Sequence, residues 1–169
     1  MQAEREELVK RTFPALRAEL ARRAVGIHEI DLRWGITDEQ IAAGSLLRLL
    51  LEEIDSCRPY FVCILGHRYG TRFQEIVPPE VLEELISEQP WMEPYRDRSV
   101  TEFEILHAAL LRPEWADRAF FFIKEGESTE GEAPDKQKAL RGLRAKLAPE
   151  DFGAVLPYTE ARDLGEKVR

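Results

Sequence analysis

Two glutamates at the start of one predicted helix, Glu102 and Glu104, are the side chains best placed to do acid–base chemistry. Ser99 has the type and position of a helix N-cap, and Glu102 follows it at the three-residue spacing of a capping box. Glu104 lies at the edge of the apolar stripe of this helix, and a partly desolvated carboxyl group can polarise a substrate hydroxyl or stabilise an oxocarbenium-like centre. Both are therefore candidate catalytic residues, although capping alone also accounts for Glu102.

A second candidate region is the glycine-flanked loop Gly66–Gly70. It follows the continuous apolar run 60–65, which predicts a strand covered on both faces, as in a parallel sheet. In open α/β sheets, ligands bind beyond the carboxyl ends of the strands, so Arg68 and Tyr69 are candidate ligand-binding residues. The loop lacks the sequence of a P-loop and of a dinucleotide fingerprint, and a simple turn is the alternative.

The segment 31–37 places an acid, a base and an aromatic residue at the end of a predicted strand, 26–33. Its position beside the carboxyl ends of the sheet makes Asp31, Arg33 and Trp34 candidate ligand-binding residues. The alternative is a surface turn with an Asp–Arg ion pair, which contributes little free energy.

The sequence patterns of metal sites and of activated nucleophiles are absent. His28, His67 and His107 fall in different predicted elements without the spacing of metal ligands, so we expect no metal and no bound cofactor. The Gly-x-Ser-x-Gly of a nucleophile elbow does not occur. Cys57 and Cys63 fit reduced core residues better than a disulfide framework.

The order of the predicted elements indicates an α/β fold. Helices are predicted over 2–24, 45–57, 98–111, 138–147 and 160–168, and strands over 26–33, 60–65, 119–123 and 152–158. Pro14 is expected to kink or split the first helix, and Gly26 to end it. The alternation favours a doubly wound, mainly parallel sheet with helices on both faces.

Two segments interrupt this alternation. Residues 78–97 contain four prolines and a short predicted helix, Glu80–Glu88, which we expect to form a small cap. Residues 124–136 are acidic and contain Gly and Pro, which is typical of a solvated loop with little intrinsic order. The length of 169 residues fits a single domain with one substantial core.

The charge and hydropathy of the chain restrict its partners. A net charge of -8 argues against a nucleic-acid partner and against docking on anionic membranes. No apolar run approaches the roughly 20 residues of a membrane span, and the charged N-terminus lacks the apolar core of a signal peptide. We therefore expect a cytoplasmic location.

Five motifs then stand in the order found in one family. They are Gln2–Val9, Asp31–Thr37, Cys57–Pro59, Gly66–Gly70 and Arg98–Ile105. Over nearly its whole length the chain resembles the TIR-like domain of unknown function at the N-terminus of NACHT/STAND NTPases. Those proteins carry WD or tetratricopeptide repeats further on, and telomerase-associated and nephrocystin-like proteins are among the relatives.

This resemblance implies a flavodoxin-like TIR fold and two alternative functions. TIR domains in the broad sense either self-assemble as signalling or effector modules, or cleave NAD at its glycosidic bond. A module of the first kind would bind copies of itself or other TIR-like domains, in a protein that also supplies NTPase and repeat domains.

In the enzymes, a glutamate opens the helix after the third strand, followed by a hydrophobic residue and, three residues on, a small one. Glu104–Ala108 matches that pattern better than Glu102 does. The resemblance therefore implies Glu104 as catalytic carboxylate and NAD as substrate, in a pocket lined by Trp34, Arg68, Tyr69 and Ser99.

The resemblance also implies a strand before position 1. The family usually opens with a strand that leads through Asp-Met into the Glu-Arg helix, and Met1 matches that methionine. We therefore expect a fragment of a longer multidomain protein. Because the absent strand helps to form the nucleotide pocket in the enzymes, its loss would weaken any catalytic activity.

Overall fold

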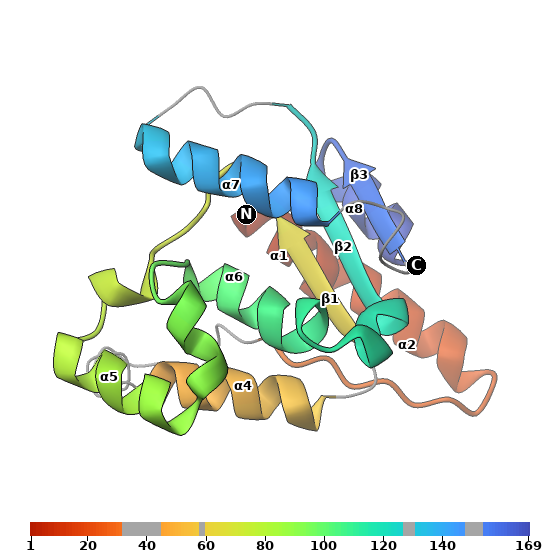
Figure 1. The fold of residues 1–169 in the computed structure, drawn as a ribbon. Coiled ribbons are helices and arrows are strands. Elements are labelled where there is room, and N and C mark those ends of the chain that lie inside the picture. The colour runs from red at the N-terminus through yellow and green to blue at the C-terminus, as the bar shows by residue number, and fades with distance from the viewer. Residues whose placement is uncertain (32–44, 58–59, 127–130, 148–153) are drawn as a thin grey trace.

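Three parallel strands form the centre of the domain in the computed structural model (Figure 1), which describes residues 1–31, 45–57, 60–126, 131–147 and 154–169. The strands β1 (Phe61–Leu65), β2 (Ala119–Lys124) and β3 (Ala154–Tyr158) lie in the order β1-β2-β3. Phe61 pairs with Ala119, and Phe120 pairs with Ala154. The predicted parallel sheet is thus confirmed, and its two longest apolar runs form adjacent strands.

Helices cover both faces of this sheet, as the doubly wound fold requires. One face packs against α6 (Val100–Ile105), the π-helical turn η4 (Leu106–Leu110) and α7 (Pro134–Lys146). The other face packs against α1 (Gln2–Glu7), the π-helical turn η1 (Leu8–Thr12), α2 (Phe13–Ala21) and α8 (Ala161–Val168). Phe121 and Phe122 follow each other on β2 and point to opposite faces, so each belongs to a different buried cluster.

A second core lies beside the sheet. It is formed by α4 (Ser45–Ser56), η2 (Phe73–Glu75), α5 (Pro79–Glu88) and η3 (Pro90–Tyr95). The helix predicted within the proline-rich segment is confirmed. Phe103 of α6 packs into this second core, whereas Ile105 of the same helix packs against the sheet. Helix α6 therefore joins the two cores, and its position fixes the residues at its N-terminus.

The first helix is split before Pro14, as predicted, because the π-helical turn η1 precedes that proline and α2 begins around it. The predicted stop at Gly26 is wrong. The helix ends at Ala21, Ala24 takes a left-handed conformation with φ of 56°, and the Val25 N–H donates to the Leu20 carbonyl at 3.0 Å. This is the hydrogen bond of a Schellman motif, with alanine where glycine is usual.

A strand is predicted over 26–33, and this prediction is wrong for residues 26–31, which form no strand. Residues 32 and 33 lie outside the described residues. The acidic residues of this segment instead pair with the first helix, Glu29 with Arg17 and Asp31 with Arg5. These ion pairs hold the segment against α1 and α2. The helix predicted from 138 begins at Pro134, where the fixed φ of proline suits the first turn.

The left-handed residue at position 24 gives a direct test of this helix end. Ala24→Gly should raise the free energy of unfolding by about 0.5–1 kcal/mol, because a Cβ is unfavourable at positive φ. Urea denaturation measures the difference. The control Ala21→Gly lies in the last helical turn and should lower stability by a similar amount; a loss of stability in both variants would contradict the described helix end.

Candidate functional site

A buried hydrogen bond joins the loop after β1 to the start of α6. The Tyr69 hydroxyl donates to Glu102 Oε2 at 2.6 Å, and both residues are 1% exposed. The Tyr69 hydroxyl oxygen in turn accepts the backbone N–H of Ser99 at 3.2 Å. Three of the predicted site residues, Tyr69, Ser99 and Glu102, therefore lie together at the carboxyl end of β1.

Ser99 is the N-cap of α6, as predicted, and its hydroxyl oxygen accepts the Glu102 N–H at 3.2 Å. In a capping box, the Ser99 N–H would also donate a hydrogen bond directly to the Glu102 carboxylate. Here the Tyr69 hydroxyl takes the place of that direct hydrogen bond. The Tyr69 hydroxyl stands between these two groups and bonds to both. The capping pattern in the sequence thus marks a three-residue network instead of a local helix cap.

Two cations compensate the buried charge of Glu102. Lys146, at the end of α7, places its Nζ 2.9 Å from Glu102 Oε1, and Arg98 Nε lies 4.0 Å from the same oxygen. A buried carboxylate without such partners would be strongly destabilising. The network therefore fastens α7 to α6 and to the loop after β1.

The state of Tyr69 favours a positioning role. Burial, together with the hydrogen bond to Glu102, raises the pKa of Tyr69 to about 12. The hydroxyl therefore keeps its proton at neutral pH and acts as a donor. The arrangement holds a carboxylate and a phenol in place without activating either as a nucleophile.

The carboxyl edge between β1 and β2 is closed by the protein's own polar groups. Helix α7 lies across this end of the two strands (Figure 1), and Arg144 Nη2 donates to the carbonyls of Gly66 at 3.0 Å and Lys124 at 3.1 Å. His67 Nε2 lies 2.8 Å from the Glu125 carbonyl oxygen, so the two loops are also joined directly. Burial lowers the pKa of Arg144. The edge at which open α/β sheets usually bind ligands is occupied here.

Two carboxylates of this edge were missed by the sequence analysis. Glu132 accepts the Tyr69 N–H with both oxygens at 3.0 Å, although its segment reads as a solvated loop. Glu4 is 2% exposed and bonds to Lys124 Nζ at 2.6 Å. Burial would raise the pKa of Glu4, but the hydrogen bond from Lys124 and other polar contacts outweigh it and hold that pKa at about 2. Glu4 lies one helical turn before Leu8, an apolar residue expected to be buried, and this spacing in the sequence indicates that Glu4 faces inward.

The other predicted site residues lie apart from this network. Glu104 is half-buried on α6, and residues two apart on a helix do not face each other, so it points away from Glu102. Arg68 is exposed, and Asp31 Oδ2 lies 2.7 Å from Arg5 Nη2 on α1. Arg33 and Trp34 lie outside the described residues. A shared hollow between Glu104 and Arg68 stays a prediction.

Two further features were sought in the part of the chain that the structure describes. It contains no group of three or more His, Cys, Asp or Glu side chains arranged to hold a metal ion. Within the same residues, none of the helices combines the length and apolar character needed to cross a membrane.

The fold and this edge define a small α/β domain whose strands end in a network of buried hydrogen bonds and ion pairs, in which Arg98 Nε and Arg144 Nε have no hydrogen-bond partner among the described residues. The family model of the domain of unknown function DUF4062 matches residues 1–169. The chain therefore belongs to this family. No solved structure gives a significant match.

Relatives among characterised sequences are much longer proteins. The chain is 31% identical to a TPR repeat-containing protein of Dictyostelium discoideum, over 72% of the chain and 8% of that protein. It is 34% identical to telomerase protein component 1 of Rattus norvegicus, over 74% of the chain and 5% of that protein. It is also 35% identical to a NACHT domain- and WD repeat-containing protein of Mus musculus, over 41% of the chain and 5% of that protein. The chain thus spans less than a tenth of the length of each of these relatives.

A double-mutant cycle tests the buried network. Tyr69→Phe and Glu102→Gln should each lower the free energy of unfolding by about 1–3 kcal/mol, because each leaves a buried polar partner unsatisfied. The coupling energy between the two should be about 1–2 kcal/mol, measured by urea denaturation. Tyr60→Phe, at a tyrosine that is 65% exposed, is the control and should change stability by less than about 0.5 kcal/mol. Strictly additive effects at 69 and 102 would refute the network.

Proposed function

We propose that this chain is a TIR-like interaction module that self-associates within a larger signalling protein. Membership in the DUF4062 family supports this role, as do relatives whose names include NACHT domains, WD repeats and TPR repeats. In such a protein the NTPase and repeat domains would be its covalent partners, and their oligomerisation would bring copies of the module together. The module would act in the cytoplasm.

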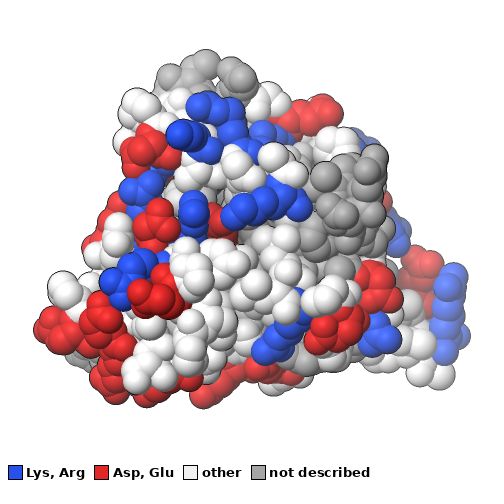
Figure 2. Space-filling view, in the orientation of Figure 1, with Lys and Arg blue, Asp and Glu red and all other residues white. Residues whose placement is uncertain are grey.

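The observation that carries this proposal is a separation of charge on one face of the domain. Figure 2 shows Lys and Arg gathered over α7, and Asp and Glu gathered over α5. Helix α7 contains five basic residues and one acidic residue, whereas α5 contains four glutamates and no basic residue. Arranged head to tail, two copies would place the basic helix of one against the acidic helix of the next. Such heterologous contacts build rings or filaments.

Some exposed charges of these two helices are unpaired within the described residues, whereas three of the four glutamates of α5 already pair with Arg48 or Arg96. Lys138 and Arg141 of α7 are exposed and make no ion pair within the described residues. On α5, Glu84 and Glu88 pair with Arg48 of the same molecule, while Glu80 is exposed and makes no ion pair within the described part of the chain. The contact would therefore rest mainly on Lys138, Arg141 and Glu80.

Cleavage of NAD by Glu104 is a second candidate function. It is favoured by the half-buried position of this carboxylate on the helix that links β1 to β2. Against it stands the carboxyl edge, where Arg144 donates hydrogen bonds to the carbonyls of Gly66 and Lys124 and so joins the ends of β1 and β2. We therefore rank self-association first.

Sedimentation velocity from low to high micromolar concentration tests the first function. The wild-type chain should self-associate. The double variant Lys138→Glu/Arg141→Glu should raise the dissociation constant of self-association by about tenfold or more, because it places like charges opposite α5. The control is Arg162→Glu on α8, which makes half of that charge change at an arginine whose side chain is 80% exposed, and it should associate like the wild type.

Two results would contradict the proposal. One is a monomer at every concentration. The other is NAD cleavage, followed by chromatography of the products, that is lost in Glu104→Gln while the Lys138→Glu/Arg141→Glu variant keeps full activity. That pattern would support NAD cleavage by Glu104 as the function of this chain, in place of self-association.

A further inference from the structure

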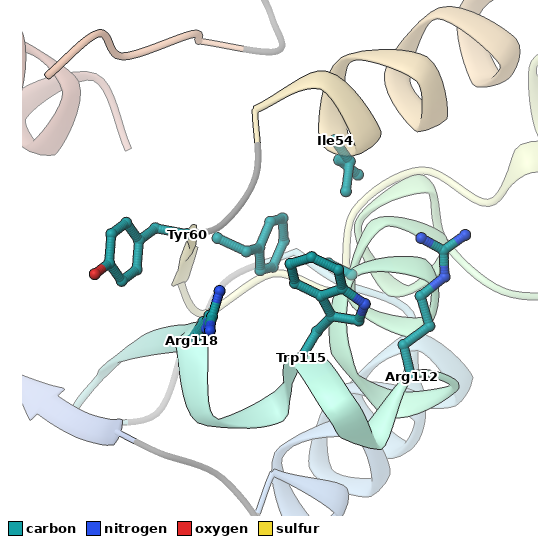
Figure 3. A pocket seen from close by; sticks show the side chains of 7 residues that line it. Ile54, Tyr60, Arg112, Trp115 and Arg118 are labelled. Atoms are coloured by element: carbon teal, nitrogen blue, oxygen red, sulfur yellow. The ribbon is translucent and has the colours of Figure 1, made fainter.

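A shallow hollow lies at the amino edge of the sheet, at the end of the strands opposite to the closed network. Its empty space, including the part open to solvent, is about 300 Å³. Ile54 of α4, Phe61 of β1 and Ala108 of η4 contribute apolar walls, and Trp115 lies among them. Figure 3 shows Ile54 and the Trp115 ring pointing toward the same space. Because this volume includes space that is open to solvent, the hollow is a surface depression against which a side chain could pack, and it encloses no cofactor-sized cavity.

Two arginines flank the Trp115 ring (Figure 3), and they differ in their partners. Arg112 Nη1 lies 2.7 Å from Asp55 Oδ1, so its charge is compensated within the domain. Arg118 is exposed, and its guanidinium carbon lies 5.8 Å from the centre of the Trp115 ring. Over the described residues, Arg118 makes no ion pair. Stacking on an aromatic ring orients a guanidinium and leaves its donors available to a carboxylate.

The rim of the hollow continues onto exposed apolar surface. Tyr60, which lines the hollow, is 65% exposed, and its ring lies 6.2 Å from the ring of Phe120. Tryptophan, tyrosine and arginine around a small apolar depression are the residue types that dominate binding energy at protein interfaces. The hollow therefore has the composition of a docking site for another polypeptide.

Charge complementarity identifies the kind of polypeptide. Like Lys138 and Arg141, Arg118 makes no ion pair within the described residues, and it differs from them in lying over an aromatic ring beside the hollow. A carboxylate from outside is the group that would compensate it and form bidentate hydrogen bonds. A neighbouring apolar side chain of the same segment would fill the space between Ile54 and Trp115.

We infer that this hollow docks an acidic segment of a partner protein, with one apolar side chain inserted beside Trp115 and an adjacent carboxylate paired with Arg118. The inference goes beyond the proposed self-association, because it concerns a different surface and a different partner. Failure of either leaves the other standing.

Fluorescence polarisation with labelled peptides tests this inference on the full chain. The probe is a short peptide with a central leucine flanked by aspartates, and its matched controls replace the aspartates by asparagine or the leucine by alanine. Wild type should bind the Asp-Leu-Asp peptide more tightly than either control. Arg118→Glu should weaken that binding about fivefold or more, and Arg118→Gln should weaken it less.

The control variant is again Arg162→Glu, which makes the same charge change far from the hollow and should bind like the wild type. Circular dichroism and thermal melting check that the Arg118 variants fold, which is expected because this side chain is exposed. Equal binding of the acidic and asparagine peptides, equal loss in Arg162→Glu, or no binding of any peptide would overturn the inference.

One further outcome would also overturn it. Self-association in sedimentation velocity that is lost in Arg118→Glu, but kept in Lys138→Glu/Arg141→Glu, would make a second copy the occupant of the hollow. The inference predicts the opposite pattern, in which Arg118→Glu self-associates like the wild type.

Discussion

The structure depends on one buried charge, the carboxylate of Glu102. It is 1% exposed, and it remains in the interior because Tyr69 and Lys146 bond to its two oxygens. These partners come from the loop after β1 and from the end of α7. A charge in such surroundings is costly unless every partner is in place, so the carboxylate ties together three segments that are distant in sequence. Removing any one partner should loosen all three.

The same edge of the sheet is held together by the protein's own polar groups. Arg144 bonds to the carbonyls at the ends of β1 and β2, and His67 joins the loops that follow them. Hydrogen bonds among the protein's own groups thus occupy much of the carboxyl edge, although the buried Arg144 Nε has no hydrogen-bond partner in the described part of the chain. Within the part of the chain that the structure describes, the charged helices α5 and α7 and the hollow around Trp115 are two surfaces accessible to a partner. Both are suited to contacts with other polypeptides, which agrees with a domain found in long repeat-containing proteins.

Much of this fold could be predicted because its signals are local. The apolar runs around Phe61 and Phe121 are long enough to define two of the strands, and Ser99 caps its helix at the expected position. The errors arose where distant contacts override local pattern. Glu29 and Asp31 pair with the first helix, so their segment forms no strand, and Ala24 adopts the left-handed conformation in place of Gly26.

The candidate site was predictable in part for the same reason. Tyr69, Ser99 and Glu102 were singled out by their places at a strand end and a helix start. Their mutual bonds span 30 and 33 residues of sequence, which no local pattern encodes. Lys146, Arg144 and Glu132 were missed because their own segments are surface-like, and only tertiary packing turns them toward the carboxyl edge.

Native-state hydrogen exchange at the Tyr69 amide tests the central claim most directly. This amide lies in a loop between β1 and η2, yet it donates to Glu132 while the side chain of Tyr69 is locked to Glu102. A closed edge predicts protection close to that of Phe121 in the central strand, because both amides would exchange only when the core opens. Exchange at the rate of an exposed loop amide, with Phe121 still protected, would show that the edge is open and would contradict this account.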